Sequence, residues 1–297
     1  MSLPRIGLGL PSAIPGTPER AVLEWAALAE DLDFASVGVI DRLVYDSQDP
    51  LVVLAAAAAV TRRVTLFTTV LNVPWRQSAV MLAKQLASLD RLSDGRLVAG
   101  LGLGGWPEDY RESRTQMAGR GAAFDAMLVE MRRAWAGEIP GASGPLPPTP
   151  PGRPRLLFGG LAARSFERMA ALGDGWVAPI LSLDILRDGI QAAKQAWSKA
   201  GRGGSPRLVT GCYVALGQDA ELTADRYIHH YYGDAYFSVV RPGVATTQAQ
   251  LQRELQQFGD AGFDDVVLFP CLPEPDQARR IASALHATGD WLATAGR

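Results

Sequence analysis

Several short segments of the sequence follow apolar runs and contain residue types that could bind a ligand or move a proton. Asp41 and Arg42 come directly after the apolar run 35–40, and the next such run ends with hydroxyl and amide side chains at Thr69 and Asn72. A carboxylate can accept a proton, and a guanidinium can hold an anion. An isolated Asp-Arg pair is more often an exposed ion pair or a cap, whereas a position at the end of a strand favours a functional role.

Four glycines lie within the six residues 100–105, and aromatic residues follow them. Glycine is unfavourable inside a strand, so this density indicates a tight turn or a flat or bulky group close to the backbone. The spacing, and the place of the segment after the fourth apolar run, differ from those of a dinucleotide-binding fingerprint. Trp106 and Tyr110 could be core residues, or they could flank an aromatic ligand.

A glycine pair, Gly159 and Gly160, joins an expected strand to an expected helix at residues 162–172. Free backbone N–H groups and the helix dipole allow such a helix start to bind phosphate without any particular side chain. Ser165 could add a hydroxyl group. Together with the glycine-rich segment 100–105, this turn predicts a planar ligand with a phosphate tail.

Residues 227–237 contain four tyrosines and a phenylalanine. This segment is either a helix packed on the rest of the fold or a hydrophobic lid over a substrate. The sequence has no Ser-His-Asp set, CxxC pair or P-loop, and its three histidines lack metal-ligand spacing, so no metal site is expected. The two cysteines lie in separate apolar runs, which favours buried, reduced thiols in a cytoplasmic protein.

The elements that would position these residues alternate along the chain. Expected strands occupy residues 5–10, 35–40, 64–71, 96–103, 155–159, 175–179, 207–216 and 265–269. Expected helices occupy residues 18–32, 50–60, 77–89, 122–135, 162–172, 183–199, 220–232, 247–259 and 276–292. Strands joined by helices lie parallel, and eight such units favour a closed (β/α)₈ TIM barrel of the α/β class over a doubly wound open sheet. A barrel would place its active site at the C-terminal ends of the strands.

Composition limits the classes of function. The 297 residues are 47% hydrophobic and 20% charged, with a formal net charge of −2, which suits a large core and argues against nucleic acid or an anionic membrane as partner. No apolar run approaches the roughly 20 residues that span a bilayer, and the start lacks a signal-peptide pattern, so a cytoplasmic location is expected. The Pro- and Gly-rich segment 137–154 is interpreted as an internal loop of a single domain covering residues 1–297.

Five segments, taken together, resemble the bacterial luciferase-like family of flavin-dependent oxidoreductases. They are residues 33–41, 60–70, 89–96, 173–176 and 261–265. The most specific is Leu-Asp-Arg-Leu-Ser-Asp-Gly-Arg at residues 89–96, which precedes the glycine-rich segment and its tryptophan. The resemblance runs in order along essentially the whole chain. It implies a (β/α)₈ barrel that binds FMN, or the deazaflavin coenzyme F420, at its C-terminal mouth.

The resemblance also implies which residues hold the flavin. Thr69 and Val70 match a strand bulge behind the flavin ring, often with a cis peptide bond that does not precede proline. Arg120 lies where a phosphate-side arginine often occurs. The expected cofactor-binding residues are Thr69, Val70, Asn72, Gly102, Gly104, Trp106, Arg120, Gly159, Gly160, Leu161, Ala162 and Ser165.

Two positions depart from the family pattern. Arg42 stands where many members have a histidine that serves as acid and base, and a guanidinium stays charged near neutrality. It could instead polarise a flavin oxygen or hold an anion. Leu103 replaces an arginine of luciferase-type members, so phosphate binding would be weaker or shared with Arg120. The expected catalytic residues are Asp41, Arg42 and Trp106, and the expected substrate-pocket residues are Tyr110, Tyr231, Tyr232 and Phe237.

The resemblance predicts a monooxygenase that uses reduced FMN from a separate reductase, together with O2, to oxidise a hydrophobic small molecule. The flavin would supply the redox chemistry, while the protein would exclude water and orient the substrate. A deazaflavin-dependent reductase or dehydrogenase is one alternative, and a flavin-binding relative without turnover is another. A homodimer is expected, because family members are often dimers and the alanine run 55–59 permits close helix packing.

Overall fold

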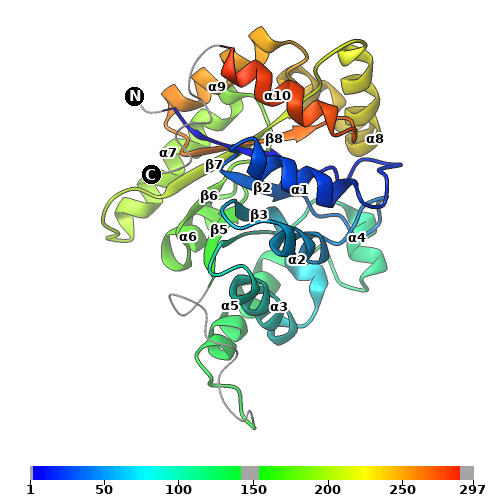
Figure 1. The fold of residues 1–297 in the computed structure, drawn as a ribbon. Coiled ribbons are helices and arrows are strands. Elements are labelled where there is room, and N and C mark those ends of the chain that lie inside the picture. The colour runs from blue at the N-terminus through cyan, green and yellow to red at the C-terminus, as the bar shows by residue number, and fades with distance from the viewer. Residues whose placement is uncertain (1–2, 142–153, 288–297) are drawn as a thin grey trace.

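Eight parallel strands form a closed barrel in the computed structural model, which describes residues 3–141 and 154–287 (Figure 1). Neighbouring strands follow chain order, and β8 pairs back with β1. The strands are β1 (Arg5–Gly9), β2 (Ser36–Val39), β3 (Thr65–Asn72), β4 (Leu97–Gly102), β5 (Arg155–Gly159), β6 (Gly175–Val177), β7 (Arg207–Val214) and β8 (Asp265–Pro270). The predicted barrel is therefore confirmed, and the open sheet is excluded.

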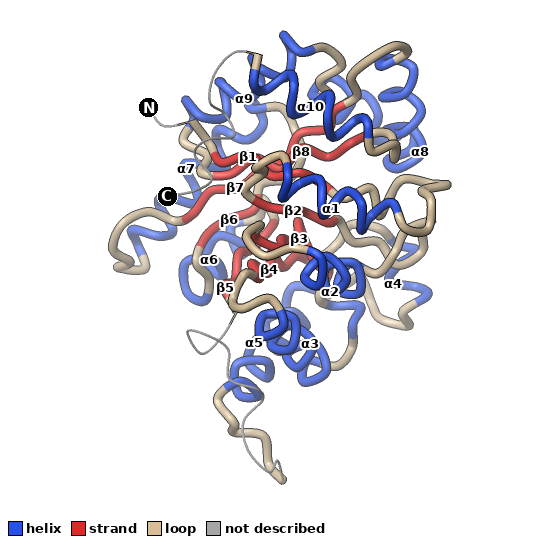
Figure 2. The backbone as a smooth tube through the Cα atoms, in the orientation of Figure 1, coloured by secondary structure: helices blue, strands red, loops and turns tan. Residues whose placement is uncertain are grey.

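Helices surround the strands on the outside of the barrel (Figure 2). They are α1 (Ala21–Asp31), α2 (Pro50–Val60), α3 (Ala79–Leu92), α4 (Pro107–Glu112), α5 (Arg120–Trp135), α6 (Ala163–Leu172), α7 (Leu183–Lys199), α8 (Ala220–Val240), α9 (Gln248–Ala261) and α10 (Asp276–His286). Two short 3₁₀ turns cover Pro74–Arg76 and Arg241–Gly243. The predicted end of the last helix, beyond residue 287, and residues 142–153 of the predicted loop lie outside the described residues.

Most helix ends differ from the prediction by three residues or fewer, but two helices differ more. The short helix α4 was not expected; it begins at Pro107, a residue whose fixed φ suits the first turn of a helix. Helix α8 continues beyond Tyr232 to Val240, although Gly233 interrupts it with a φ of 65°. Only glycine adopts such a backbone without a steric penalty, so this residue lets α8 bend over the barrel mouth.

Apolar side chains from alternate strand positions fill the barrel interior. Phe67, Val98, Leu157, Val177 and Val209 form this cluster, and the half-buried Val70 packs against it from above. The intervening residues of the same strands face the surrounding helices and belong to the larger outer core. Because the interior is filled, space for a ligand lies above it, at the C-terminal ends of the strands.

Asp49 caps α2, as its position before Pro50 predicts. Its carboxylate accepts hydrogen bonds from the backbone N–H groups of Leu51 and Val52, at 2.9 and 3.1 Å. At α9, Thr247 and Gln250 form a reciprocal capping box. Both caps fix where a helix begins, and the cap on α2 also fixes the end of the loop that follows Asp41.

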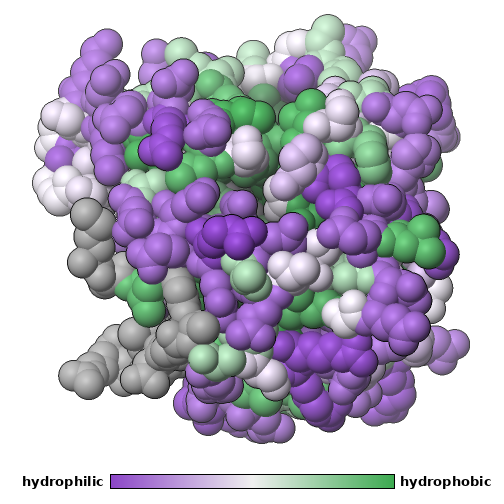
Figure 3. All heavy atoms as spheres, turned by 90° about the horizontal axis from the view of Figure 1, so that it is seen from above, coloured by the Kyte–Doolittle hydropathy of each residue, from purple (hydrophilic) through white to green (hydrophobic). Residues whose placement is uncertain are grey.

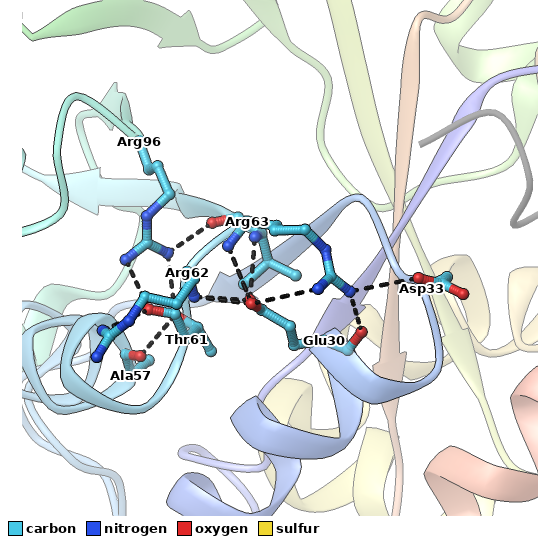
Figure 4. Close-up of polar contacts among 8 residues, drawn as sticks. Glu30, Asp33, Ala57, Thr61, Arg62, Arg63 and Arg96 are labelled. Atoms are coloured by element: carbon cyan, nitrogen blue, oxygen red, sulfur yellow. Dashed lines mark hydrogen bonds and ion pairs between the residues drawn. The ribbon is translucent and has the colours of Figure 1, made fainter. Parts of the chain in front are cut away.

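A polar network at the start of β3 contains residues from two of the family-like segments, 60–70 and 89–96 (Figure 4). The Glu30 carboxylate on α1 accepts the backbone N–H groups of residues 62–64, at 2.8 to 3.3 Å. The Arg96 guanidinium donates to the Thr61 hydroxyl and to the Val64 carbonyl, both at 2.9 Å. These contacts join α1, the loop after α2 and the start of β4. They stabilise the N-terminal end of the barrel, opposite its mouth.

The face of the molecule seen in Figure 3 is largely hydrophilic, with groups of apolar side chains between polar ones. Within residues 3–141 and 154–287, no helix combines the length and apolarity that crossing a membrane would require. Some large apolar side chains are nevertheless exposed on α2 and α3, including Val52 and Met81.

Candidate functional site

A cavity of about 260 Å³ lies at the C-terminal ends of the strands, on the side of the barrel where α4 and α8 lie in Figure 1. It is lined by Ile40, Asp41, Thr69, Val70, Asn72, Gly104, Trp106, Gly159, Gly160, Val177, Ala178, Pro179, Ile180, Tyr213, Tyr231 and Tyr232. Ten of these sixteen residues belong to the predicted site. The segments after β2, β3, β4 and β5 are therefore brought together, as expected for parallel strands whose C-terminal ends share one rim.

A bulge in β3 forms one wall of the cavity. The Thr69–Val70 peptide bond is cis, and the register between β3 and β4 shifts between Thr68 and Leu71. A Cβ atom on Gly102 would lie 2.4 Å from Val70 Cγ2, and one on Gly159 would lie 3.0 Å from Val70 Cγ1. The absent side chains of these two glycines thus leave the space that Val70 occupies. Gly102 does not line the cavity itself.

Asp41 lies at the end of β2, and its carboxylate is held by two donors. Its Oδ2 atom accepts the Asn72 backbone N–H at 2.8 Å and the Arg76 Nη2 at 2.9 Å. The Asn72 side-chain amide donates to the Asp41 carbonyl at 2.9 Å. Burial raises the pKa of Asp41, while Arg76 and the Asn72 N–H act in the opposite direction. Through these contacts the Asp41 carboxyl group orients the ends of β2 and β3 and holds Arg76 beside them.

Arg42 does not line the cavity, although the sequence suggested a polar role near the reactive face. Its side chain is 3% exposed, with Nε 2.9 Å from Asp109 and Nη2 2.7 Å from Glu108. Asp109 is completely buried and also accepts the Val44 N–H at 2.8 Å. The guanidinium is thus occupied in joining the loop after β2 to α4, because the buried Asp109 carboxylate needs a cationic partner.

Aromatic side chains form the opposite wall. The Trp106 ring lies edge-on to Tyr231, with 5.9 Å between centroids, and tilted against Tyr232 at 6.0 Å. The hydroxyl oxygens of Tyr232 and Tyr213 are 3.0 Å apart. Burial raises the pKa of Tyr213 well above its usual value and that of Tyr232 to about 12. Both phenols are therefore protonated at neutral pH.

The glycine pair after β5 leads from the cavity to the start of α6. Gly160 has a φ of 115°, and a Cβ atom there would lie 2.6 Å from the Ser165 hydroxyl oxygen. Its carbonyl accepts the indole N–H of Trp176 at 2.9 Å, which holds the turn in place. The helix begins without a side-chain cap. Leu161 and Ala162 are exposed beside the cavity, while Ser165 is buried below the turn.

Three further predicted site residues, besides Arg42 and Gly102, lie away from the cavity. Tyr110 is 2% exposed, because α4 turns it beneath the glycine-rich turn, where its hydroxyl donates to the Leu103 carbonyl. Phe237 lies beyond the interruption in α8 and packs edge-on against His229, with 5.5 Å between ring centroids. Arg120 begins α5 and donates from Nη1 to the carbonyl of Met117 at 3.1 Å. None of these three lines the cavity.

Sequence reasoning missed two polar residues of this region. Arg76 follows Trp75 in the turn after β3, where it looks like an ordinary surface arginine, yet it holds Asp41. Tyr213 lies in the predicted strand 207–216 and is absent from the expected site residues. The signal that could have found it is its place near the C-terminal end of a barrel strand, since such positions face the active site.

Comparison with known proteins shows the family to which the chain belongs. A family model described as luciferase-like monooxygenase matches residues 5–268. Curated relatives include an uncharacterized protein of Mycobacterium tuberculosis, 32% identical over 171 residues. That match covers 54% of this chain and 60% of the relative, so the chain matches less than two thirds of the relative's length.

Solved structures show the same fold at low sequence identity. The monooxygenase RslO1 from Streptomyces bottropensis superposes with a TM-score of 0.79 at 22% identity, over 95% of this chain and 98% of that one. The FMN complex of the oxygenating constituent of 3,6-diketocamphane monooxygenase, from Pseudomonas putida, gives a TM-score of 0.76 at 16% identity, over 99% of both chains. An F420-dependent secondary alcohol dehydrogenase gives 0.75 at 16%, over 98% of this chain and 100% of that one. Because the family model covers most of the sequence, the chain belongs to the luciferase-like monooxygenases, a family of oxidoreductase enzymes.

Proposed function

We propose that the chain is a monooxygenase that binds reduced FMN from a separate reductase and uses O2 to oxidise a hydrophobic organic molecule. The observation that carries this proposal is that the charged side chains around the cavity are held in ion pairs. Asp41 is paired with Arg76, and Arg42 is enclosed by Glu108 and Asp109. Oxidation of an alcohol by hydride transfer needs a base for the hydroxyl proton, and no free carboxylate or imidazole lines the cavity among the described residues.

The residues present fit a flavin. Gly102 and Gly159 let Val70 and the backbone beside it form a wall against which a flat ring can lie. The exposed turn at Gly160 leads to the uncapped start of α6, whose backbone N–H groups would hold a phosphate. Bound reduced FMN would supply the two electrons with which one oxygen atom of O2 enters the substrate and the other leaves as water.

The protein's own residues would exclude water and orient the reactants. Trp106 and Tyr231 close one side of the cavity with apolar surface, while Ile180 adds an aliphatic wall. Asp41 and Asn72 fix the backbone beside the bulge at Thr69. A dry, rigid site of this kind suits a reaction in which solvent would divert a reactive group.

Parallel anaerobic titrations with reduced FMN and reduced F420, followed by addition of O2, test the proposal. We expect saturable FMN binding, seen as a change in flavin absorbance, and O2 consumption coupled to a hydrophobic substrate. Tighter binding of F420 than of FMN, with no O2 uptake, would instead identify a deazaflavin-dependent reductase. Binding of flavin without turnover of any substrate would support the non-catalytic alternative.

We also propose that the chain forms a homodimer through α2. This helix is apolar on its buried face and also on its outer face, where Val52 is 68% and Val60 45% exposed. The small side chains between them allow another helix to approach closely. The single domain over residues 1–297 and the cytoplasmic location stay predictions.

A further inference from the structure

Two tyrosine hydroxyls meet at the wall of the cavity and serve no role derived above. Tyr213 comes from β7 and Tyr232 from α8, and their hydroxyl oxygens are 3.0 Å apart. Tyr213 is 1% exposed, Tyr232 is half-buried, and both line the cavity. The Tyr213 ring also packs edge-on against Tyr227, which holds it in position.

The two hydroxyl groups together carry one more proton than their mutual hydrogen bond uses. Each hydroxyl carries one proton, and a hydrogen bond between the two uses only one of them. The other proton has no acceptor among the side chains and backbone atoms of residues 3–141 and 154–287. Both phenols stay protonated at neutral pH, because burial raises their pKa values. The pair therefore presents one hydrogen-bond donor to whatever occupies the cavity.

The position of the pair separates it from the proposed flavin contacts. The barrel closes in chain order, so β7 lies four strands from β3 and across the mouth from the bulge at Thr69–Val70. The glycine turn after β5, where a phosphate would bind, is a third position on the rim. A ring placed against the bulge would leave the tyrosine side of the cavity to the second reactant.

We propose that Tyr213 and Tyr232 together donate a hydrogen bond to an oxygen atom of the substrate, so that the enzyme selects apolar compounds carrying a carbonyl or similar acceptor. This inference rests on the proposed function, since it takes the cavity to be the substrate site. The surrounding Trp106, Ile180 and Tyr231 supply apolar contacts. A buried donor without its acceptor is unfavourable, which is why a hydrocarbon of the same shape would bind more weakly.

The pair of ligands acetophenone and α-methylstyrene tests this inference, because they have the same shape and only the ketone carries an oxygen. Their dissociation constants would be measured with the FMN-loaded protein and, separately, with the flavin-free protein. We expect the wild type to prefer the ketone by about tenfold, the usual effect of one hydrogen bond. We also expect the carbonyl stretching frequency of bound acetophenone to fall.

The variants Tyr232→Phe and Tyr213→Phe should each weaken the preference and the frequency shift. A single variant keeps one hydroxyl that can still donate, so the double variant should lose both effects completely. Tyr236→Phe is the matched control, since Tyr236 is exposed on the same helix and also packs against Trp106. Thermal unfolding of each variant would show that it is folded.

Several outcomes would overturn the inference. They are equal affinity of the wild type for both ligands, binding of neither, or a preference that survives in the double variant. If the tyrosine variants instead shift the absorbance and affinity of FMN and leave the ketone preference unchanged, the donor serves the flavin. Failure of FMN to bind at all would refute the proposed function, whereas the measurements on flavin-free protein would still test the tyrosine pair.

Discussion

The guanidinium carbon of Arg42 lies 4.0 Å from the centroid of the Trp106 ring. Trp106 lines the cavity and Arg42 does not, so the arginine supports this part of the cavity wall from outside. The same side chain also lies within 6 Å of the rings of Tyr45 and Tyr231, at 5.3 and 5.7 Å. A cation over an aromatic face is attracted by the ring quadrupole, more strongly when both are shielded from water. Arg42 thus fixes Trp106 through stacking while its nitrogen atoms bind α4.

This arrangement predicts that Arg42→Ala destabilises the fold. The substitution would leave the fully buried Asp109 carboxylate without its cation, and loss of one partner from a buried pair costs about 3–5 kcal/mol. Urea unfolding would measure this change in the free energy of unfolding. Arg111→Ala is the control: the Arg111–Glu112 pair is exposed, so its loss should change stability by about 0.5 kcal/mol or less. Full stability combined with lost turnover in Arg42→Ala would instead indicate a direct role in the reaction.

A second prediction concerns the glycines behind the bulge. Gly102→Ala would place a methyl group 2.4 Å from Val70 Cγ2, so Val70 must move toward the flavin side of the cavity. Overpacking of this kind costs about 1–3 kcal/mol, and we expect the dissociation constant for FMN to rise by roughly tenfold or more. Flavin titration measures this directly. Gly105→Ala, in the same glycine-rich segment, would meet nothing within 4 Å and should bind FMN normally. Equal affinities for the two variants would contradict the proposed placement of the ring.

Stability in acid provides a third prediction, at the other end of the barrel. Burial acts to raise the pKa of Glu30, but the backbone N–H groups of Arg63, Arg62 and Val64 outweigh it and lower the pKa below its usual 4.5. Because the folded-state pKa is the lower one, Glu30 stabilises the fold fully above about pH 4.5, and this contribution is lost as the pH falls through the folded-state value.

Glu30→Gln should therefore lower the free energy of unfolding by about 1–3 kcal/mol at pH 7. The difference from wild type should shrink as the pH falls below about 4.5, which urea unfolding at several pH values would show. Glu19→Gln, at an exposed position before α1, serves as the control and should leave stability unchanged. A difference between wild type and Glu30→Gln that stays constant with pH would show that the carboxylate charge does not matter.

Much of the site could be predicted because its determinants are local in sequence. Apolar alternation located the strands, and parallel strands bring their C-terminal ends to one rim, so Asp41, Thr69, Gly104 and Gly160 were expected near one another. The glycines were also informative, because a residue without a Cβ atom marks where the backbone turns sharply or where a neighbouring group lies close.

The residues whose positions differ from expectation share a different cause, because their positions depend on contacts between distant segments. Arg42 is bound by Asp109, 67 residues away, and nothing at either position reveals that the two would pair. Tyr110 is buried because it lies on α4, a helix of six residues that was too short to be predicted. The sequence of β7 marks Tyr213 as buried, but only the position of α8 shows that its hydroxyl meets that of Tyr232.

The proposed homodimer gives the last prediction. A helix that is apolar on every side, as α2 is, is usually covered on every side, yet Val52 on α2 is 68% exposed. Met81, on the neighbouring α3, is 58% exposed. Sedimentation equilibrium at micromolar concentration should give about twice the chain mass of 31.8 kDa. Val52→Lys should shift the equilibrium toward monomer, because burying an unpaired ammonium group in an apolar interface is costly. Val129→Lys, on the exposed face of α5 and 58% exposed, should leave the mass unchanged. A monomeric wild type would refute the dimer, and dissociation by Val129→Lys alone would move the interface from α2 to α5.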